Sequence, residues 1–164
     1  MTTRRRFLTL AGAGLLAPAA GVLPNGPARG DVRQMLRLQK LDLDLAGSKA
    51  VTWAYGDRVP GPEIRVTEGD VLDVHVFNHL PEPSLVHWHG LAIENAMDGT
   101  HLTQNPIMPG ERFTYRFRVP DSGTHWYHAH SGVQADKGLY GALIVEARHE
   151  TLRYDRDHVL VLDD

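Results

Sequence analysis

Cysteine is absent from this chain of 164 residues. Its absence excludes disulfide bonds, thiolate zinc sites, iron–sulfur clusters and a cysteine nucleophile. It also excludes a blue (type 1) copper site within the chain, because that site requires a cysteine thiolate. Histidine, by contrast, occurs 10 times. An excess of imidazole without any thiol favours a metal site built from imidazole alone.

The chain also lacks any strong charge imbalance. Lys and Arg total 17 against 20 Asp and Glu, for a formal net charge of -3. No stripe of Lys and Arg stands out, so nucleic acid is not an expected partner. The length is typical of one domain, and a hydrophobic content of 42% suffices for an ordinary core.

The amino terminus has an apolar run, Phe7–Ala17, that is too short to cross a membrane. It has the length of the hydrophobic part of a signal peptide, and Ala17-Pro18-Ala19 offers a small-x-small cleavage pattern. Arg4-Arg5 before it is typical of a twin-arginine signal. We therefore predict a signal peptide over residues 1–19, export to the periplasm or the extracellular space, and no membrane attachment after cleavage. A basic helix or a membrane anchor is the alternative.

Residues 20–32 are rich in Gly, Pro and Ala and predict a linker. From residue 33 to 164, short alternating segments separated by Gly and Pro predict an antiparallel β-sandwich with Greek-key connections. A break in the alternation at Gln39-Lys40 predicts a bulge in the first strand. The further strands are expected at Val51–Tyr55, Ile64–Val66, Leu72–Phe77, Leu85–His89, Arg112–Val119, Thr124–His130, Leu139–Glu146 and His158–Leu162.

Two His-x-His pairs lie on these predicted strands. Side chains on a strand alternate between its faces, so His87 and His89 share one face, about 7 Å apart along the strand. His128 and His130 share a face in the same way, and neighbouring strands would bring all four imidazoles together. Imidazole suits copper, zinc, iron and nickel, and spacing alone does not choose among them. One pair alone is more often an ordinary surface feature.

The remaining six histidines are expected to be solvated surface residues. His125 has the opposite parity to His128 and His130, whereas the others lie on a polar strand face, in turns and loops or near the carboxyl end. These others are His75, His79, His101, His149 and His158.

A series of motifs resembles the amino-terminal plastocyanin-like (cupredoxin) domain of multicopper oxidases, the family of laccases, ascorbate oxidase and copper-resistance oxidases. The order and spacing follow that family from about residue 51 to 146. The segments that carry the resemblance are Trp53-Ala54-Tyr55, Pro60–Val66, Glu68-Gly69-Asp70, His87–Leu91, Met97-Asp98-Gly99, Thr103-Gln104, Pro106-Ile107, Pro109-Gly110, Gly123–His130, Gly138–Gly141 and Leu143-Ile144-Val145.

The resemblance implies a role for each histidine of the two pairs. His87 matches a type 2 copper ligand, and His89, His128 and His130 match type 3 ligands. Asp98 matches an acidic residue that helps to deliver protons during oxygen reduction, although an Asp before Gly99 is also a common turn residue. Trp88, Trp126 and Tyr127 are expected to pack and to orient the strands. The implied cofactor is copper, and the implied partners are O2 and a small reducing substrate or metal ion.

The chain also departs from the family. A complete enzyme of the family needs eight histidines for its trinuclear copper cluster and a cysteine for its type 1 site. The resemblance places four of these histidines and the cysteine in carboxy-terminal cupredoxin domains. We therefore expect a first domain that supplies half of the cluster and relies on the missing domains or on other subunits. The alternatives are a free-standing exported module that binds or sequesters copper without turnover, and a cupredoxin scaffold that serves only as a structural or interaction protein.

Overall fold

A computed structural model describes residues 30–163. The predicted signal peptide, residues 1–19, lies outside the described residues, as does most of the linker predicted for residues 20–32. The first strand begins at Asp31, shortly before the predicted domain start at residue 33. Within the described part of the chain, no helix is long and apolar enough to cross a membrane.

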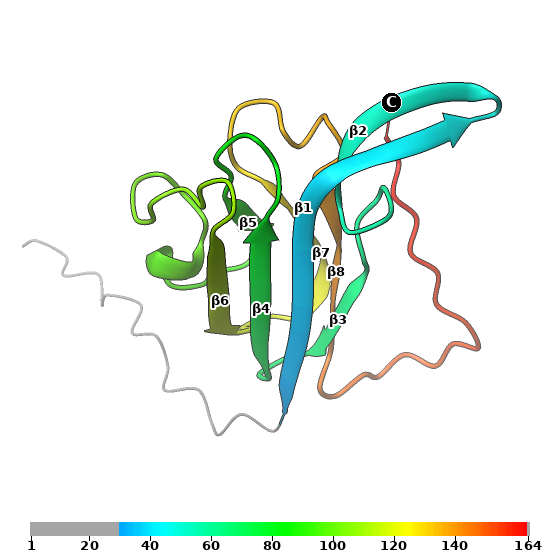
Figure 1. The fold of residues 1–164 in the computed structure, drawn as a ribbon. Coiled ribbons are helices and arrows are strands. Elements are labelled where there is room, and N and C mark those ends of the chain that lie inside the picture. The colour runs from blue at the N-terminus through cyan, green and yellow to red at the C-terminus, as the bar shows by residue number, and fades with distance from the viewer. Residues whose placement is uncertain (1–29, 164) are drawn as a thin grey trace, which may run out of the picture.

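The described residues form two four-stranded β-sheets, and β4 and β1 of one lie in front of β7 and β8 of the other in Figure 1. The first sheet has the order β2-β1-β4-β6, and the second has the order β3-β8-β7-β5. The strands are β1 (Asp31–Leu45), β2 (Ser48–Tyr55), β3 (Ile64–Thr67), β4 (Val71–Asn78), β5 (Val86–His89), β6 (Arg112–Arg118), β7 (Gly123–Ala129) and β8 (Tyr140–Glu146), with a short 3-10 helix, η1 (Asn95–Met97), between β5 and β6.

The predicted all-β, cupredoxin-like sandwich is confirmed, but the expectation of purely antiparallel pairing is wrong. β1 runs parallel to β4, and β3 runs parallel to β8. The chain leaves the first sheet after β2, forms β3 in the second sheet and returns for β4. Such crossovers bring strands of the same direction side by side, which no hairpin connection can do.

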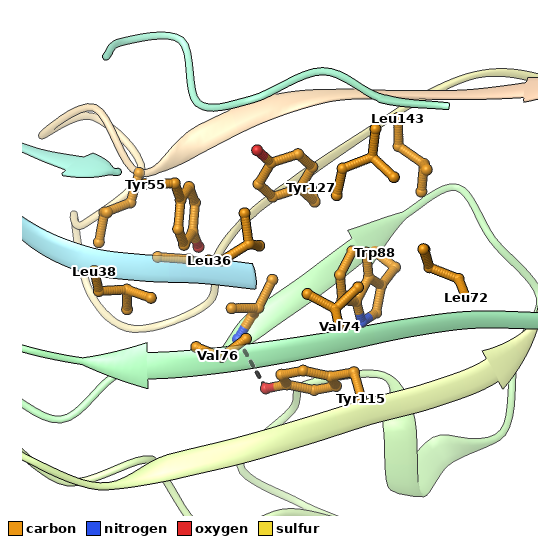
Figure 2. Packing of buried hydrophobic residues seen from close by; sticks show 14 of the residues in the cluster. Leu36, Leu38, Tyr55, Leu72, Val74, Val76, Trp88, Tyr115, Tyr127 and Leu143 are labelled. Carbon is orange, nitrogen blue, oxygen red and sulfur yellow. Dashed lines mark hydrogen bonds between the residues drawn. The ribbon is translucent and has the colours of Figure 1, made fainter. Parts of the chain in front are cut away.

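The core lies between the sheets and is built from every second residue of each strand. On β4, Leu72, Val74 and Val76 are buried between the sheets, as period-two alternation requires. Trp88 and Tyr115 lie among these aliphatic side chains in Figure 2, with their ring centroids 5.5 Å apart. Burial on this scale stabilises by about 2 kcal/mol for each large apolar side chain, so the core fixes how the two sheets lie against each other.

The predicted bulge at Gln39-Lys40 is absent. β1 pairs with β2 in one continuous register from Leu38 opposite Tyr55 to Leu45 opposite Ser48. β1 pairs with β4 only as far as Leu38, and beyond it β1 and β2 form a two-stranded arm that projects from the sandwich in Figure 1. The phase of the leucines therefore changes where the strand leaves the sandwich, without an inserted residue.

The last predicted strand, His158–Leu162, is also wrong. Residues 147–163 contain no strand, and the side chains of Leu160 and Leu162 are 84% and 94% exposed. Alternating apolar residues form a strand only when a partner strand accepts their hydrogen bonds, and no described strand pairs with this segment.

Candidate metal centre

The candidate centre lies on the outer face of the second sheet, where the edge strand β5 pairs with β7. The register sets His87 directly opposite His128 and Trp88 opposite Tyr127. Trp88 and Tyr127 point into the core, where both are fully buried, and the two imidazoles therefore point outward. The imidazoles thus stand on strands that buried aromatic rings hold in place.

Three imidazoles converge at this position. The ligand nitrogens of His87, His89 and His128 all lie within 4.8 Å of one another. The ring centroid of His130 is 5.2 Å from that of His87 and 6.2 Å from that of His128. The structure therefore brings all four predicted residues into one cluster, in which His130 lies beside the group of three.

Backbone carbonyl groups orient two of these rings. His87 Nδ1 lies 2.8 Å from the carbonyl oxygen of Asp98, and His128 Nδ1 lies 2.9 Å from the carbonyl oxygen of Ala129. A carbonyl oxygen only accepts hydrogen bonds, so each Nδ1 carries the proton of the neutral ring and each Nε2 keeps a free lone pair. Metal-binding histidines are commonly held by this kind of contact.

His89 is oriented the other way, with its Nδ1 3.2 Å from His128 Nε2. Two imidazole nitrogens that bind one ion at about 2 Å in a roughly tetrahedral arrangement lie about 3.3 Å apart. The separation of His89 Nδ1 and His128 Nε2 therefore fits two ligands of one metal ion. Neutral imidazoles without thiolate are a donor set that copper accepts.

Burial lowers the pKa of both His128 and His130 from the ordinary value for histidine. Neighbouring imidazoles, His87 foremost, lower both pKa values further because they disfavour a second positive charge. The hydrogen bond to Ala129 raises the pKa of His128, and Asp98 raises that of His130, but burial prevails. Both rings therefore stay neutral, and able to coordinate, to a lower pH than a solvated histidine.

Asp98 touches the cluster with its side chain as well as its backbone. Its Oδ1 lies 3.2 Å from His87 Nδ1. The next residue, Gly99, has a φ of 69°, and a Cβ atom there would lie only 1.8 Å from the carbonyl oxygen of Val86. The loop can approach β5 this closely only because residue 99 is glycine, and this approach holds Asp98 against His87.

Trp126, which was expected to pack and to orient the strands, packs on the outer face of the sheet and not in the core. Its side chain is 41% exposed. Its ring stacks on His128, with centroids 4.1 Å apart, and on His89, with centroids 4.9 Å apart. Trp126 lies two residues before His128, so its side chain points outward with the imidazoles. This spacing can be read in the sequence, and it predicts the position of the ring better than its apolar character does.

The expectation that His125 is a solvated surface residue is also wrong. Its parity is that of the buried Tyr127, and its Nε2 is buried without a hydrogen-bond partner among the described residues. Its Nδ1 would lie 3.0 Å from a Cβ atom at Gly90, so the ring packs tightly against the turn that follows His89. The other five histidines outside the cluster are exposed, as predicted. They are His75, His79, His101, His149 and His158.

The sandwich and its imidazole cluster define a cupredoxin-like domain with a candidate metal centre, and comparisons with known proteins give its family. A family model described as multicopper oxidase matches residues 38–150. Multicopper oxidase MmcO from Mycobacterium tuberculosis is 47% identical over 133 residues, which cover 81% of this chain and 26% of that protein. Copper resistance protein A from Escherichia coli is 37% identical over 175 residues, covering 99% of this chain and 29% of that protein.

A comparison with solved structures also indicates the multicopper oxidase family. A multi-copper oxidase from Pseudomonas thermotolerans superposes with a TM-score of 0.72 at 38% identity, covering 76% of this chain and 31% of that one. The chain belongs to the multicopper oxidase family. It spans less than a third of the length of these three relatives.

Proposed function

We propose that this chain is the copper-binding amino-terminal domain of a laccase-like oxidoreductase and supplies half of the ligands of a trinuclear copper centre. The observation that carries the proposal is the convergence of His87, His89 and His128, whose ligand nitrogens lie within 4.8 Å of one another. Membership of the multicopper oxidase family supports copper as the metal.

Within this proposal each imidazole has a separate task. His89 Nδ1 and His128 Nε2, 3.2 Å apart, would hold one type 3 copper ion. His87, whose Nε2 is left free by the carbonyl contact at its Nδ1, would hold the type 2 ion. His130, beside the group of three, would hold the other type 3 ion. The remaining four histidine ligands and the cysteine of a type 1 site come from other domains or subunits.

Bound copper supplies one-electron steps that couple oxidation of a small substrate or metal ion to the reduction of O2. The residues of this chain orient the imidazole ligands and supply protons. The carbonyl groups of Asp98 and Ala129 keep the protons of His87 and His128 on Nδ1. The Asp98 carboxylate, 3.2 Å from His87 Nδ1, lies beside the cluster and would relay protons toward it when copper is bound. This role makes it a candidate proton relay.

The chain of residues 1–164 can be titrated with Cu²⁺ while its stability to urea is measured. A ligand that binds only the folded state at a free concentration of 100 times its Kd stabilises by about 2.7 kcal/mol. Replacement His128→Ala should abolish this stabilisation and lower the bound copper, because it removes a ligand shared with His89. His149→Ala, at an exposed site away from the cluster, is the matched control and should change neither. Equal copper binding by His128→Ala and the unaltered chain would contradict the proposal.

A free-standing copper-binding module without turnover is the second candidate, because the four clustered histidines and the predicted export signal are the features that such a module needs. Both candidates bind copper, so oxygen consumption in the presence of a reducing substrate separates them. The oxidase domain should consume oxygen only after the carboxy-terminal cupredoxin domains of its protein are supplied. A copper-loaded chain that stays inactive with those domains present would support the module.

We also propose that the protein is exported by the twin-arginine route. The motif Arg4-Arg5 and the cleavage pattern at Ala17-Pro18-Ala19 support this assignment. Intact-mass analysis of the exported protein should show the loss of about 19 residues. Replacement Arg4→Lys,Arg5→Lys should leave full-length protein in the cytoplasm, and normal export of that variant would exclude the twin-arginine route.

A further inference from the structure

The outer face of the first sheet, opposite to the histidine cluster, is built of three rows of side chains across β1, β4 and β6. The strand registers place Arg33, Asp73 and Arg116 in one row and Met35, His75 and Thr114 in the next. The third row consists of Arg37, Phe77 and Arg112. Residues of one row lie on neighbouring strands about 4.8 Å apart.

The charges of the first row are paired. Arg116 donates to Asp73 at 2.7 Å and to Asp31 at 2.9 Å. Arg33 lies 3.9 Å from the same carboxylate of Asp73. The middle row is also satisfied, because His75 contacts the hydroxyl group of Thr114 at 3.1 Å and Asp73 at 3.3 Å.

The charges of the third row are not paired. Neither Arg37 nor Arg112 forms an ion pair with any residue in the range 30–163, although both are exposed. Phe77 holds its neighbours in place: the guanidinium carbon of Arg112 lies 4.9 Å from the Phe77 ring centroid, and the His79 ring centroid lies 4.3 Å away. One guanidinium group and one imidazole therefore pack on the Phe77 ring, and Arg37 stands on the neighbouring strand directly beside Phe77.

A groove of about 390 Å³ lies over this row. No carboxylate lines it, although the chain as a whole has a formal net charge of -3. Its charged or hydrogen-bonding side chains are Arg37, His75, His79, Arg112 and Thr114, and apolar side chains, among them Met35, complete it. The volume is that of a site for a small organic molecule.

We propose that this groove binds the phosphate group of a small soluble phosphate ester. Arg37 and Arg112 flank Phe77, so their Cα atoms are about 10 Å apart and their long side chains can close on one anion from both sides. A phosphate group carries nearly two negative charges and three strong acceptor oxygens, which match two guanidinium forks. A single carboxylate has one charge and matches only one of them. Met35 and the exposed edge of Phe77 provide apolar surface for the organic part of the ester.

The test is calorimetric titration of the chain of residues 1–164 with inorganic phosphate and with phenyl phosphate, at constant ionic strength set with chloride. Both probes should bind, and phenyl phosphate should bind more tightly because of the apolar surface. Arg37→Gln and Arg112→Gln should each weaken phosphate binding roughly tenfold, since each removes a charge-assisted contact. Arg112→Lys keeps the charge but loses the fork and should weaken binding less.

Arg58→Gln is the matched control, because Arg58 is an exposed arginine that does not line the groove. Its phosphate affinity should equal that of the unaltered chain. Equal weakening by Arg58→Gln and Arg112→Gln would overturn the proposal, because it would show only a general charge effect. Binding to vesicles of anionic phospholipid without binding to either soluble probe would overturn it too. The groove lies on the other sheet from the cluster of His87, His89, His128 and His130. Phosphate binding should therefore be the same with and without copper, and each proposal can fail without the other.

Discussion

The row of Arg33, Asp73 and Arg116 on the first sheet and the histidine cluster on the second arrange their ionisable groups in opposite ways. On the first sheet, Asp73 is 6% exposed and accepts from Arg116 at 2.7 Å, with Arg33 beside it, so charges of opposite sign alternate across three strands. On the second sheet, imidazoles lie beside imidazoles, and within residues 30–163 their one ion-pair contact with a carboxylate is that of His87 with Asp98.

This difference separates a paired row that stabilises the fold, on the first sheet, from a cluster of like groups that serves a ligand, on the second. A carboxylate between two guanidinium groups gains from its neighbours at neutral pH. Clustered imidazoles cannot compensate one another's charge, and each disfavours protonation of the next. Groups with perturbed pKa values in such an arrangement are typical of functional sites. Three substitutions or conditions test this contrast, in order of the expected effect.

The largest effect is expected from Gly99→Ala, which breaks the support of the histidine face. The new Cβ atom would lie 1.8 Å from the carbonyl oxygen of Val86, in addition to the cost of a positive φ. We expect a loss of about 3 kcal/mol or more in the free energy of unfolding, measured with urea, because the loop that carries Asp98 must move away from β5.

Gly110→Ala is the matched control for this prediction. Gly110 has a φ of 81° and nothing within 4 Å of a Cβ atom, so it bears only the conformational cost, about 1–2 kcal/mol. Equal losses in the two variants would mean that the contact between the Asp98 loop and β5 does not constrain the fold.

A smaller effect is expected from Asp73→Asn, which breaks the charge pairing on the first sheet. The amide removes the negative charge that faces Arg33 and Arg116 but keeps the size of the side chain. We expect the melting temperature to fall by about 2–4 °C, with the loss reduced because the guanidinium groups are partly in solvent. Asp57→Asn removes a fully solvated partner of Arg58 and should leave the melting temperature unchanged. A more stable Asp73→Asn variant would refute the view that this paired row stabilises the fold.

The smallest effect is a pH dependence that arises on the histidine face. Burial lowers the pKa of His128 and His130 in the folded chain, whereas the unfolded chain has the ordinary value of about 6.5. Above that pH both states are neutral and stability is constant. As the pH falls below about 6.5, the unfolded state takes up protons first, so stability falls until the lower folded-state pKa values are passed. Urea unfolding of the metal-free chain at pH 7.5 and 5.5 should show this loss, and His128→Gln,His130→Gln should reduce it. A loss of the same size in that variant would exclude these two imidazoles as its source.

Alternation along single strands was the part of the structure that the sequence predicted well. It placed His87 with His89, and His128 with His130, on outward faces, and it predicted most of the strands. The register between strands is not encoded by alternation, so the sequence did not reveal that His87 lies opposite His128. The parallel pairs and the unpaired segment over residues 147–163 depend on contacts between distant parts of the chain in the same way.

The residue types in the sequence also failed to predict the contacts that backbone groups make. The hydrogen-bond acceptors that orient His87 and His128 are carbonyl groups of Asp98 and Ala129, which any residue type possesses. The sequence therefore identified the carboxylate of Asp98 from its resemblance to a family, and it could not identify the carbonyl contact. The glycine at position 99 is the feature of the sequence that reflects this contact, because the close approach to Val86 excludes a side chain.

The shortness of β5 has a consequence for how the chain folds. β5 has four residues and lies at the edge of its sheet, and a slip by one residue against β7 would turn Trp88 to solvent and His87 to the core. An ion held between His89 and His128 would exist only in the native pairing and would select it over the slipped one. In the proposed copper-loaded state, the metal would thus favour the native register of β5 against β7 as well as serve as a cofactor.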